Sequence, residues 1–169
     1  MKKLFLSIIL LVSTNALANT IHISPDFRIG PHLGSGVAGG GFQYGLADTL
    51  GLEALYASYS HTSSEILRSH TRLETYRVGG QFPVIPAANI SLQIEAGVVK
   101  YEGTRNSYTS DEVRYGAATG ASISAAWVIF VNDNLGFRLG GDFNFIDQNK
   151  STDSHSVYAT IATGVVFQF

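Results

Sequence analysis

Apolar and polar residues alternate with a period of two along most of this sequence, and this pattern constrains the fold more than any other feature. In residues 135–145 an apolar face alternates with a face of glycine, charged and amide side chains. Residues 157–169 and 90–99 repeat the scheme. Successive side chains of a β-strand point to opposite faces, so the pattern predicts strands that each have two different faces.

Turn signals divide the chain into eight such segments. They cover residues 21–33, 37–46, 50–60, 72–82, 90–101, 113–130, 135–146 and 156–169. Short connections alternate with longer polar ones, which are residues 61–71, 102–112 and 147–155. Bacterial outer-membrane barrels have this arrangement, with short periplasmic turns and longer extracellular loops. The sequence therefore predicts an all-β fold, an eight-stranded antiparallel transmembrane β-barrel.

A soluble β-sandwich or a lipocalin-like barrel is the alternative, and it would turn the apolar faces inward. The polar faces here are small and rich in glycine, which favours a narrow lumen over a solvated surface. Strands in lipid must close into a barrel, because an unpaired backbone group in hydrocarbon costs several kcal/mol. Pro25 and Pro31 cannot donate to a strand ladder, so we expect them near strand ends or at a bulge.

The first residues have the pattern of a secretory signal peptide. Lys2 and Lys3 precede an apolar run at residues 4–12, and Ala16-Leu17-Ala18 supplies the small residues that a signal peptidase reads. The apolar run is shorter than the about 20 residues that a transmembrane helix needs. We therefore expect a signal peptide at residues 1–18, cleaved after Ala18, and a barrel domain at residues 19–169.

Composition excludes several classes of site. The formal net charge is -2 and the chain contains no cysteine. Nucleic-acid binding usually needs a basic face, and thiolate metal sites and disulfides need cysteine, so we expect none of these. His61 and His70 flank a polar connection that contains Glu65; we interpret them as solvated, with a metal site as the alternative. No cofactor is predicted.

Charged residues also fall on the faces that are predicted to point into the lumen. These are Arg28, Glu53, Arg77, Glu95, Arg138 and Asp142, with Asp26 near the periplasmic end. An eight-stranded barrel is only wide enough for side chains to fill its interior, and a buried charge needs a partner. We therefore predict a salt-bridged plug, with a conducting pore as the alternative.

The remaining basic residues gather at the extracellular end. We expect Arg72, Lys100 and Arg114 to contact the phosphates of lipopolysaccharide, the alternative being that they are solvated loop charges. Aromatic residues often form girdles where such barrels cross the membrane boundary. The candidates for these girdles are Tyr56, Tyr76, Tyr115 and Trp127.

The chain ends in Gly164-Val165-Val166-Phe167-Gln168-Phe169, which resembles the signal that the barrel assembly machinery reads. Gly164, Phe167 and Phe169 match that signal, and Ala162 departs from its polar position. With the signal peptide and the eight segments, the mature chain resembles the small eight-stranded outer-membrane barrels of the OmpX/Ail and OmpA transmembrane-domain type. The resemblance implies a Gram-negative outer membrane and a non-enzymatic role in adhesion, host interaction or envelope integrity. The implied partners are lipopolysaccharide, the assembly machinery and host macromolecules.

The resemblance leaves one enzymatic alternative. The lipid A deacylase PagL has a similar size and uses a His-x-Ser pair with a glutamate. Asp142-Phe143-Asn144 occupies the place where we expect that motif, and it lacks these residues. His155 and Ser156 are adjacent, so their side chains would point to opposite faces. We predict no catalytic site; a PagL-like hydrolase and a small pore remain the alternatives.

Overall fold

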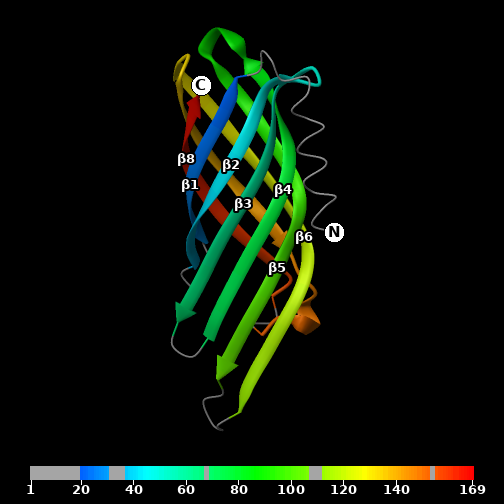
Figure 1. The fold of residues 1–169 in the computed structure, drawn as a ribbon. Helices are drawn as coiled ribbons and strands as arrows, with labels where there is room; N and C mark the ends of the chain where they lie inside the picture. Colours follow the sequence, from blue (N-terminus) through cyan, green and yellow to red (C-terminus); the bar gives the residue numbers. More distant parts are fainter. Residues whose placement is uncertain (1–19, 31–36, 67–68, 107–111, 153–154) are drawn as a thin grey trace.

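The computed structural model describes residues 20–30, 37–66, 69–106, 112–152 and 155–169. In these residues each strand pairs antiparallel with its sequence neighbours, and β1 pairs with β8 to close the barrel (Figure 1). The prediction of an eight-stranded antiparallel barrel is confirmed. The predicted signal peptide lies outside the described residues. No helix in the described part of the chain is both long and apolar enough to cross a membrane.

The strands follow chain order around the barrel. They are β1 (Ile21–Gly30), β2 (Val37–Thr49), β3 (Leu52–Ile66), β4 (Ser69–Ile85), β5 (Ile90–Asn106), β6 (Val113–Asn132), β7 (Leu135–Phe145) and β8 (Val157–Gln168). Two short 3-10 helices, η1 (Pro86–Ala88) and η2 (Gln148–Lys150), lie in connections. Closure is completed where Ile21 and Phe169 exchange backbone hydrogen bonds of 3.1 and 3.0 Å.

The two ends of the barrel differ. One end carries the start of β1, the end of β8 and the short β2–β3, β4–β5 and β6–β7 connections (Figure 1). We call it the turn end and the opposite one the loop end. Leu50 and Gly51 form the two-residue β2–β3 turn with φ values of 57° and 76°. Positive φ at both central residues is the geometry of the type I′ hairpin, which matches the twist of paired strands.

The strands at the loop end are longer than predicted. Residues 61–71 were expected to form a loop, but β3 and β4 pair as far as Ile66 and Ser69. This stretch is rich in Ser, Thr and His, so it lacks the apolar alternation that marks a strand, although its backbone pairs equally well. β3 to β6 contain 15, 17, 17 and 20 residues, whereas β1, β2, β7 and β8 contain 10, 13, 11 and 12. The longer strands therefore project as a sheet beyond the barrel (Figure 1).

Pro25 lies in the middle of β1, and not at a strand end or a bulge as expected. The ladder between β1 and β8 pairs Ile23 with Phe167 and Asp26 with Gly164, and it has no paired residues between these two positions. The register is the same on both sides of the gap. The barrel thus tolerates the missing N–H group through a local interruption of pairing.

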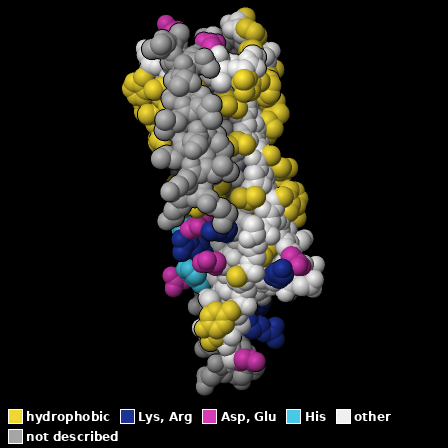
Figure 2. All heavy atoms as spheres, turned by 45° about the vertical axis from the view of Figure 1, so that its right-hand side comes forward, with side chains coloured by type: hydrophobic (Ala, Val, Ile, Leu, Met, Phe, Trp, Pro, Cys, Tyr) yellow, Lys and Arg dark blue, Asp and Glu magenta, His cyan; other side chains and the backbone are white. Residues whose placement is uncertain are grey.

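The two faces of the wall are inverted relative to a soluble protein. Large apolar side chains such as Phe27, Phe137, Leu139 and Ile161 are more than half exposed on the outside. On the face seen in Figure 2, apolar side chains cover the part near the turn end, and charged and histidine side chains gather toward the loop end. The lumen holds arginine, glutamine and glutamate side chains instead. This distribution suits a lipid solvent outside the barrel.

Candidate functional site

Six charged side chains in the lumen form a closed ring of alternating sign. Each arginine contacts two carboxylates: Arg28 contacts Asp26 and Asp142, Arg77 contacts Asp142 and Glu95, and Arg138 contacts Glu95 and Asp26. Arg28 and Asp142 are in close contact, and the N–O distances are 2.7 Å for Arg28–Asp26, 3.1 Å for Arg77–Asp142 and 3.2 Å for Arg138–Asp26. Arg77 and Arg138 lie 3.7 and 4.0 Å from Glu95. The three positive and three negative charges balance.

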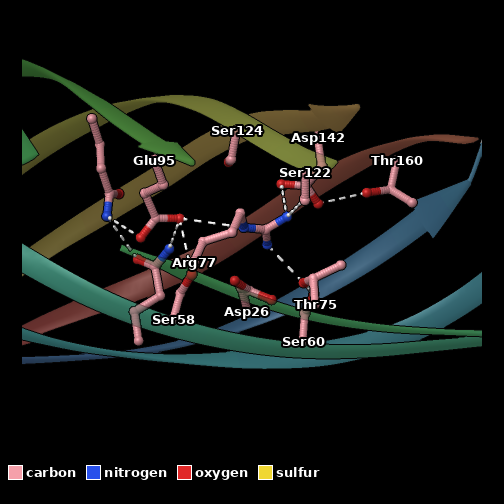
Figure 3. Close-up of polar contacts among 12 residues, drawn as sticks. Asp26, Ser58, Ser60, Thr75, Arg77, Glu95, Ser122, Ser124, Asp142 and Thr160 are labelled. Atoms are coloured by element: carbon pink, nitrogen blue, oxygen red, sulfur yellow. Dashed lines mark hydrogen bonds and ion pairs between the residues drawn. The ribbon is translucent and has the colours of Figure 1, made fainter. Parts of the chain in front are cut away.

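The ring, which we call the lumen ring, connects opposite walls of the barrel. β1 supplies Asp26 and Arg28, β7 supplies Arg138 and Asp142, and β4 and β5 supply Arg77 and Glu95. Figure 3 shows Arg77 reaching across the lumen between Glu95 and Asp142. Every side chain in the ring is at most 2% exposed. The ring therefore ties together strands that share no backbone hydrogen bonds.

Neutral side chains satisfy further atoms of the ring. Glu95 accepts hydrogen bonds from Ser58 at 3.1 Å and from Gln43 and Gln93 at 3.3 Å. Thr160 donates to Asp142 at 2.7 Å (Figure 3), and Arg138 donates through Nε to Gln93 at 2.9 Å. Buried ion pairs are tolerated only when such hydrogen bonds accompany them, because desolvation of both charges is costly.

Gly41 makes room for the lumen ring. A Cβ at this position would lie 2.5 Å from Asp26 Oδ1, 2.9 Å from the Tyr59 carbonyl oxygen and 3.0 Å from Arg28 Nε. The Tyr59 oxygen belongs to the backbone and cannot move aside. The Gly39-Gly40-Gly41 run therefore supplies space beside a bulky neighbour at its last position.

An apolar layer fills the lumen on the loop side of the ring. It consists of Leu73, Val99, Tyr101, Ile146 and Tyr158. The segment that contains η2 then covers the layer. The Tyr101 hydroxyl lies 2.6 Å from the Thr152 hydroxyl and accepts a 3.0 Å hydrogen bond from the Thr152 N–H group. Ring, apolar layer and covering segment together fill the loop half of the lumen.

The predicted interior charges divide into two groups. Five of them lie in the ring, but Glu53 lies apart from it at the turn end, and Asp26 completes the ring instead. The buried side chains of β3 include Tyr56, Ser58 and Ser60, so alternation along this strand places Glu53 on the opposite side from them. The prediction had assigned the two faces of this strand the other way round.

A second group of charges crosses the outer face of β3 to β5. We call it the outer band; it comprises His61, Arg72, Glu74 and Lys100. Arg72 contacts Glu74, and Glu74 Oε1 lies 3.8 Å from His61 Nδ1. Glu74 pairs in register with both His61 and Lys100. The structure thus brings together two of the three residues expected to contact lipopolysaccharide.

Arg114 does not join the outer band. By alternation it shares the inward side of β6, and it pairs in register with Arg105. It lines a cleft together with Lys150 and other residues of the segment around η2. The polar connection alone does not reveal which side of a strand a charge occupies.

Aromatic residues mark the border between the apolar surface and the outer band. The ring centroids of Tyr59 and Tyr76 lie 5.2 Å apart, two register positions nearer the turn end than the pair of His61 and Glu74. Tyr76, Tyr115 and Trp127 are exposed on the outside. Tyr56 was expected among them, but it is 1% exposed and lies in the lumen. Tyr56 alternates in phase with Ser58 and Ser60, which also point into the lumen.

No His-x-Ser pair was predicted, but two occur in the sequence, both away from the segment where the PagL motif would lie. His22 and Ser24 are buried in the lumen on β1. His61 and Ser63 share the outer face of β3, and His61 faces Glu74. Glu65 pairs in register with His70. In the described ranges, no three His, Asp or Glu side chains are grouped so that they could hold a metal ion.

Solved structures share this architecture. The N-terminal barrel domain of Pseudomonas aeruginosa OprF matches with a TM-score of 0.61 and 16% identity, covering 89% of this chain and 98% of that one. Ail of Yersinia pestis matches with a TM-score of 0.66 and 13% identity, covering 89% of this chain and 97% of that one. Neisserial surface protein A matches with a TM-score of 0.60 and 12% identity, and the match covers the same shares of the two chains, 89% and 97%. The chain has the fold of the small outer-membrane barrels.

No protein-family model and no curated protein matches this sequence. The likeness is therefore one of fold, and it rests on strand number, closure and length. At these identities, the side chains of the lumen ring and the outer band must be interpreted from their own geometry.

The C-terminal residues expected to form an assembly signal occupy different faces of this barrel. Phe167 and Phe169 are exposed at the turn end. A Cβ at Gly164 would lie 2.5 Å from the Pro25 carbonyl oxygen and 2.9 Å from the Asp26 Cβ. Gly164 thus has a packing role of its own, since it leaves space for a member of the lumen ring.

Proposed function

We propose that this protein is a non-enzymatic surface protein of a Gram-negative outer membrane, exported by a signal peptide that is cleaved after Ala18. The filled lumen carries the proposal: ring and apolar layer occupy the space that a transport path would need. The part of the molecule that extends furthest is the β3–β6 sheet at the loop end. In bacterial barrels the end opposite the short turns faces the exterior. The sheet is then the surface available to partners.

Lipopolysaccharide is the proposed partner within the membrane. Arg72 and Lys100 lie where the apolar surface ends, next to the Tyr59–Tyr76 pair. Long cationic side chains at such a border can keep their stems in the apolar region and place their charge among lipid phosphates. Arg114 lies on the other side of its strand, so we assign it to the loop-end surface rather than to this contact.

The assembly machinery and host macromolecules are proposed as further partners. Exposed Phe167 and Phe169 at the C-terminal end of β8 support recognition of the C-terminal signal during insertion. Ail has been solved with the heparin analogue sucrose octasulfate. The loop end of this chain carries Arg105, Arg114 and Lys150, which supports an anionic host macromolecule as a ligand of the projecting sheet. The role is then adhesion or host interaction, with envelope integrity as the other reading.

Shortening the β5–β6 hairpin tests the proposal. Residues 103–116 would be replaced by an Asn-Gly turn, and cells that display either form would be assayed for adhesion and for resistance to detergent. Loss of adhesion with unchanged resistance supports host interaction, and loss of resistance alone supports envelope integrity. Unchanged adhesion and unchanged detergent resistance would contradict a role for the projecting sheet.

A lipid A hydrolase is the second candidate, and one observation favours it. Ser63, His61 and Glu74 share the outer face at the membrane border, in the residue types of a nucleophile, a base and an orienting acid. Glu74 also contacts Arg72, which competes for its carboxylate. Mass spectrometry of lipid A from cells with and without the protein decides this candidate. Unchanged acylation excludes it, and loss of an acyl chain that requires Ser63 establishes it.

A further inference from the structure

The turn end of the lumen holds a polar cluster that the lumen ring does not use. Four of its buried side-chain atoms make no hydrogen bond of normal geometry within the described residues: His22 Nε2, Ser24 Oγ, Glu53 Oε2 and Gln81 Nε2. His22, Ser24 and Gln81 are at most 1% exposed. Buried polar atoms in proteins are nearly always paired. Such a concentration of unpaired atoms indicates a binding partner from outside the chain.

The chain fixes these side chains in place. Tyr56 Oη lies 2.6 Å from His22 Nδ1 and donates to Gln81 Oε1 at 3.0 Å. Tyr56 thus holds one ring nitrogen of His22 and the amide oxygen of Gln81, and His22 also interacts with Gln168 at the cavity wall. Gly45 supports the arrangement, because a Cβ there would lie 2.5 Å from the Tyr56 ring. The inner side of the cluster is therefore held in a fixed arrangement.

A cavity opens beside this cluster. It has a volume of about 340 Å³, and its lining includes Glu53, Ser91, Phe130, Asp133 and Gln168. The His22 ring lies 5.8 Å from the Phe130 ring and interacts electrostatically with Glu53. His22 therefore lies at the inner side of the cavity, next to two of its lining residues.

The charge at this end is one-sided. Asp48, Glu53 and Asp133 are its carboxylates, and all described Lys and Arg residues lie in the lumen ring or at the loop end. The buried Oε2 atom of Glu53 thus has no cation from the described chain as a partner. An occupant that satisfies the Glu53 carboxylate needs a positive charge and hydrogen-bond donors.

We propose that this turn-end pocket binds a small organic cation that carries a primary ammonium group. An ammonium group donates three hydrogen bonds, which suits the carboxylate of Glu53 in the cavity wall. Phe130 offers an aromatic ring in the same cavity for a cation–π contact. In the proposed orientation the pocket faces the periplasm, so this binding is independent of the partners of the projecting sheet.

Isothermal titration calorimetry with putrescine tests the proposal on protein purified from membranes in a non-ionic detergent. The buffer is phosphate, because Tris itself carries an ammonium group. 1,4-Butanediol, which has the same length but no charge, is the matched control ligand. We expect saturable binding of putrescine and none of butanediol, and Glu53→Gln should weaken putrescine binding at least tenfold. Glu102→Gln, at an exposed carboxylate near the loop end, should leave the affinity unchanged.

A second variant guards against a folding defect in the first. Phe130→Leu keeps the cavity apolar and should weaken putrescine binding about fivefold through loss of the cation–π contact. Electrophoresis with and without boiling checks that each variant is folded. Equal binding of butanediol, an affinity that Glu53→Gln leaves unchanged, or the absence of saturable binding would overturn the proposal. The buried atoms would then hold water only.

Discussion

The lumen ring and the outer band use the same residue types in opposite environments. Both place arginine beside carboxylates, although the ring joins β1, β4, β5 and β7 whereas Arg72 and Glu74 lie two residues apart on β4. In the ring every side chain is at most 2% exposed, whereas Arg72 in the outer band is 44% exposed and Glu74 is 18% exposed. Water and salt screen the outer pair, and the ring lies in a region of low dielectric.

This difference in exposure shows that the ring and the outer band have different roles. A buried ion pair is not strong evidence for stability, yet removal of one partner leaves an uncompensated charge. The ring therefore fixes which strands face each other and which side chains fill the lumen. An exposed pair contributes little to stability, so the outer band is free to exchange partners. Its charges can contact lipid phosphates without a large cost to the fold.

Removal of one arginine from the ring should have the largest effect. Arg138→Ala leaves Asp26 and Glu95 with one arginine each, and we expect a loss of about 3–5 kcal/mol in the free energy of unfolding. Urea unfolding in lipid vesicles measures it. Arg72→Ala in the outer band is the matched control, with an expected loss of about 1 kcal/mol or less. Equal losses in the two variants would remove the distinction between the regions.

Filling the space that Gly41 leaves beside the ring should have the next largest effect on the free energy of unfolding. Gly41→Ala places a Cβ against Asp26 and the Tyr59 carbonyl oxygen, and overpacking of this kind costs about 1–3 kcal/mol. Gly40→Ala is the control, because its Cβ would point outward and meet its nearest atom at 3.2 Å. The same unfolding assay compares them. A Gly41 variant as stable as the Gly40 variant would show that the ring can shift at no cost.

The segment around η2 that covers the apolar layer should make a smaller contribution to the free energy of unfolding. Tyr101→Phe removes the hydroxyl that binds Thr152, and a typical net loss for such a contact is about 1 kcal/mol. Hydrogen exchange of the Thr152 amide should accelerate in the variant. Tyr115→Phe, at a largely exposed ring, should change neither stability nor exchange. Unchanged exchange in the Tyr101 variant would separate the segment around η2 from the lumen.

The smallest effect is expected for the outer band itself. Glu74→Gln should change the free energy of unfolding by less than about 1 kcal/mol. The change should vanish in 1 M salt, where screening acts over about 3 Å. A ring variant such as Arg138→Ala should keep most of its effect in the same salt. A salt-independent effect of Glu74→Gln would indicate that the outer band is shielded from solvent.

Strand number, strand order and closure could be predicted from the sequence, because alternation and turn residues are local signals. Most of the ring could be predicted as well, since Arg77, Glu95 and Arg138 stand on clear inward positions. The ends of the strands could not. Polar stretches such as residues 61–66 pair through their backbone, and their side chains give no apolar signal. Glu53 was predicted among the lumen charges but lies outside the ring, because both faces of residues 52–60 mix polar and apolar side chains and alternation does not show which face points inward.

Contacts that depend on the closed barrel could not be predicted either. Tyr101 and Thr152 are 51 residues apart, and they meet only because the segment around η2 folds over the lumen. The role of Gly164 beside Asp26 likewise requires β1 and β8 to be paired. These features follow from which strands close the barrel, and no local pattern encodes their distances.

Electrical recording across a planar bilayer tests the central claim most directly, namely that side chains fill the lumen around a balanced ring of charges. The purified protein would be inserted at single-molecule density and held at a range of voltages. A lumen filled by the ring and the apolar layer predicts no stable conductance above the bilayer baseline. Uniform, long-lived current steps from the unmodified protein would show an open path and contradict the account.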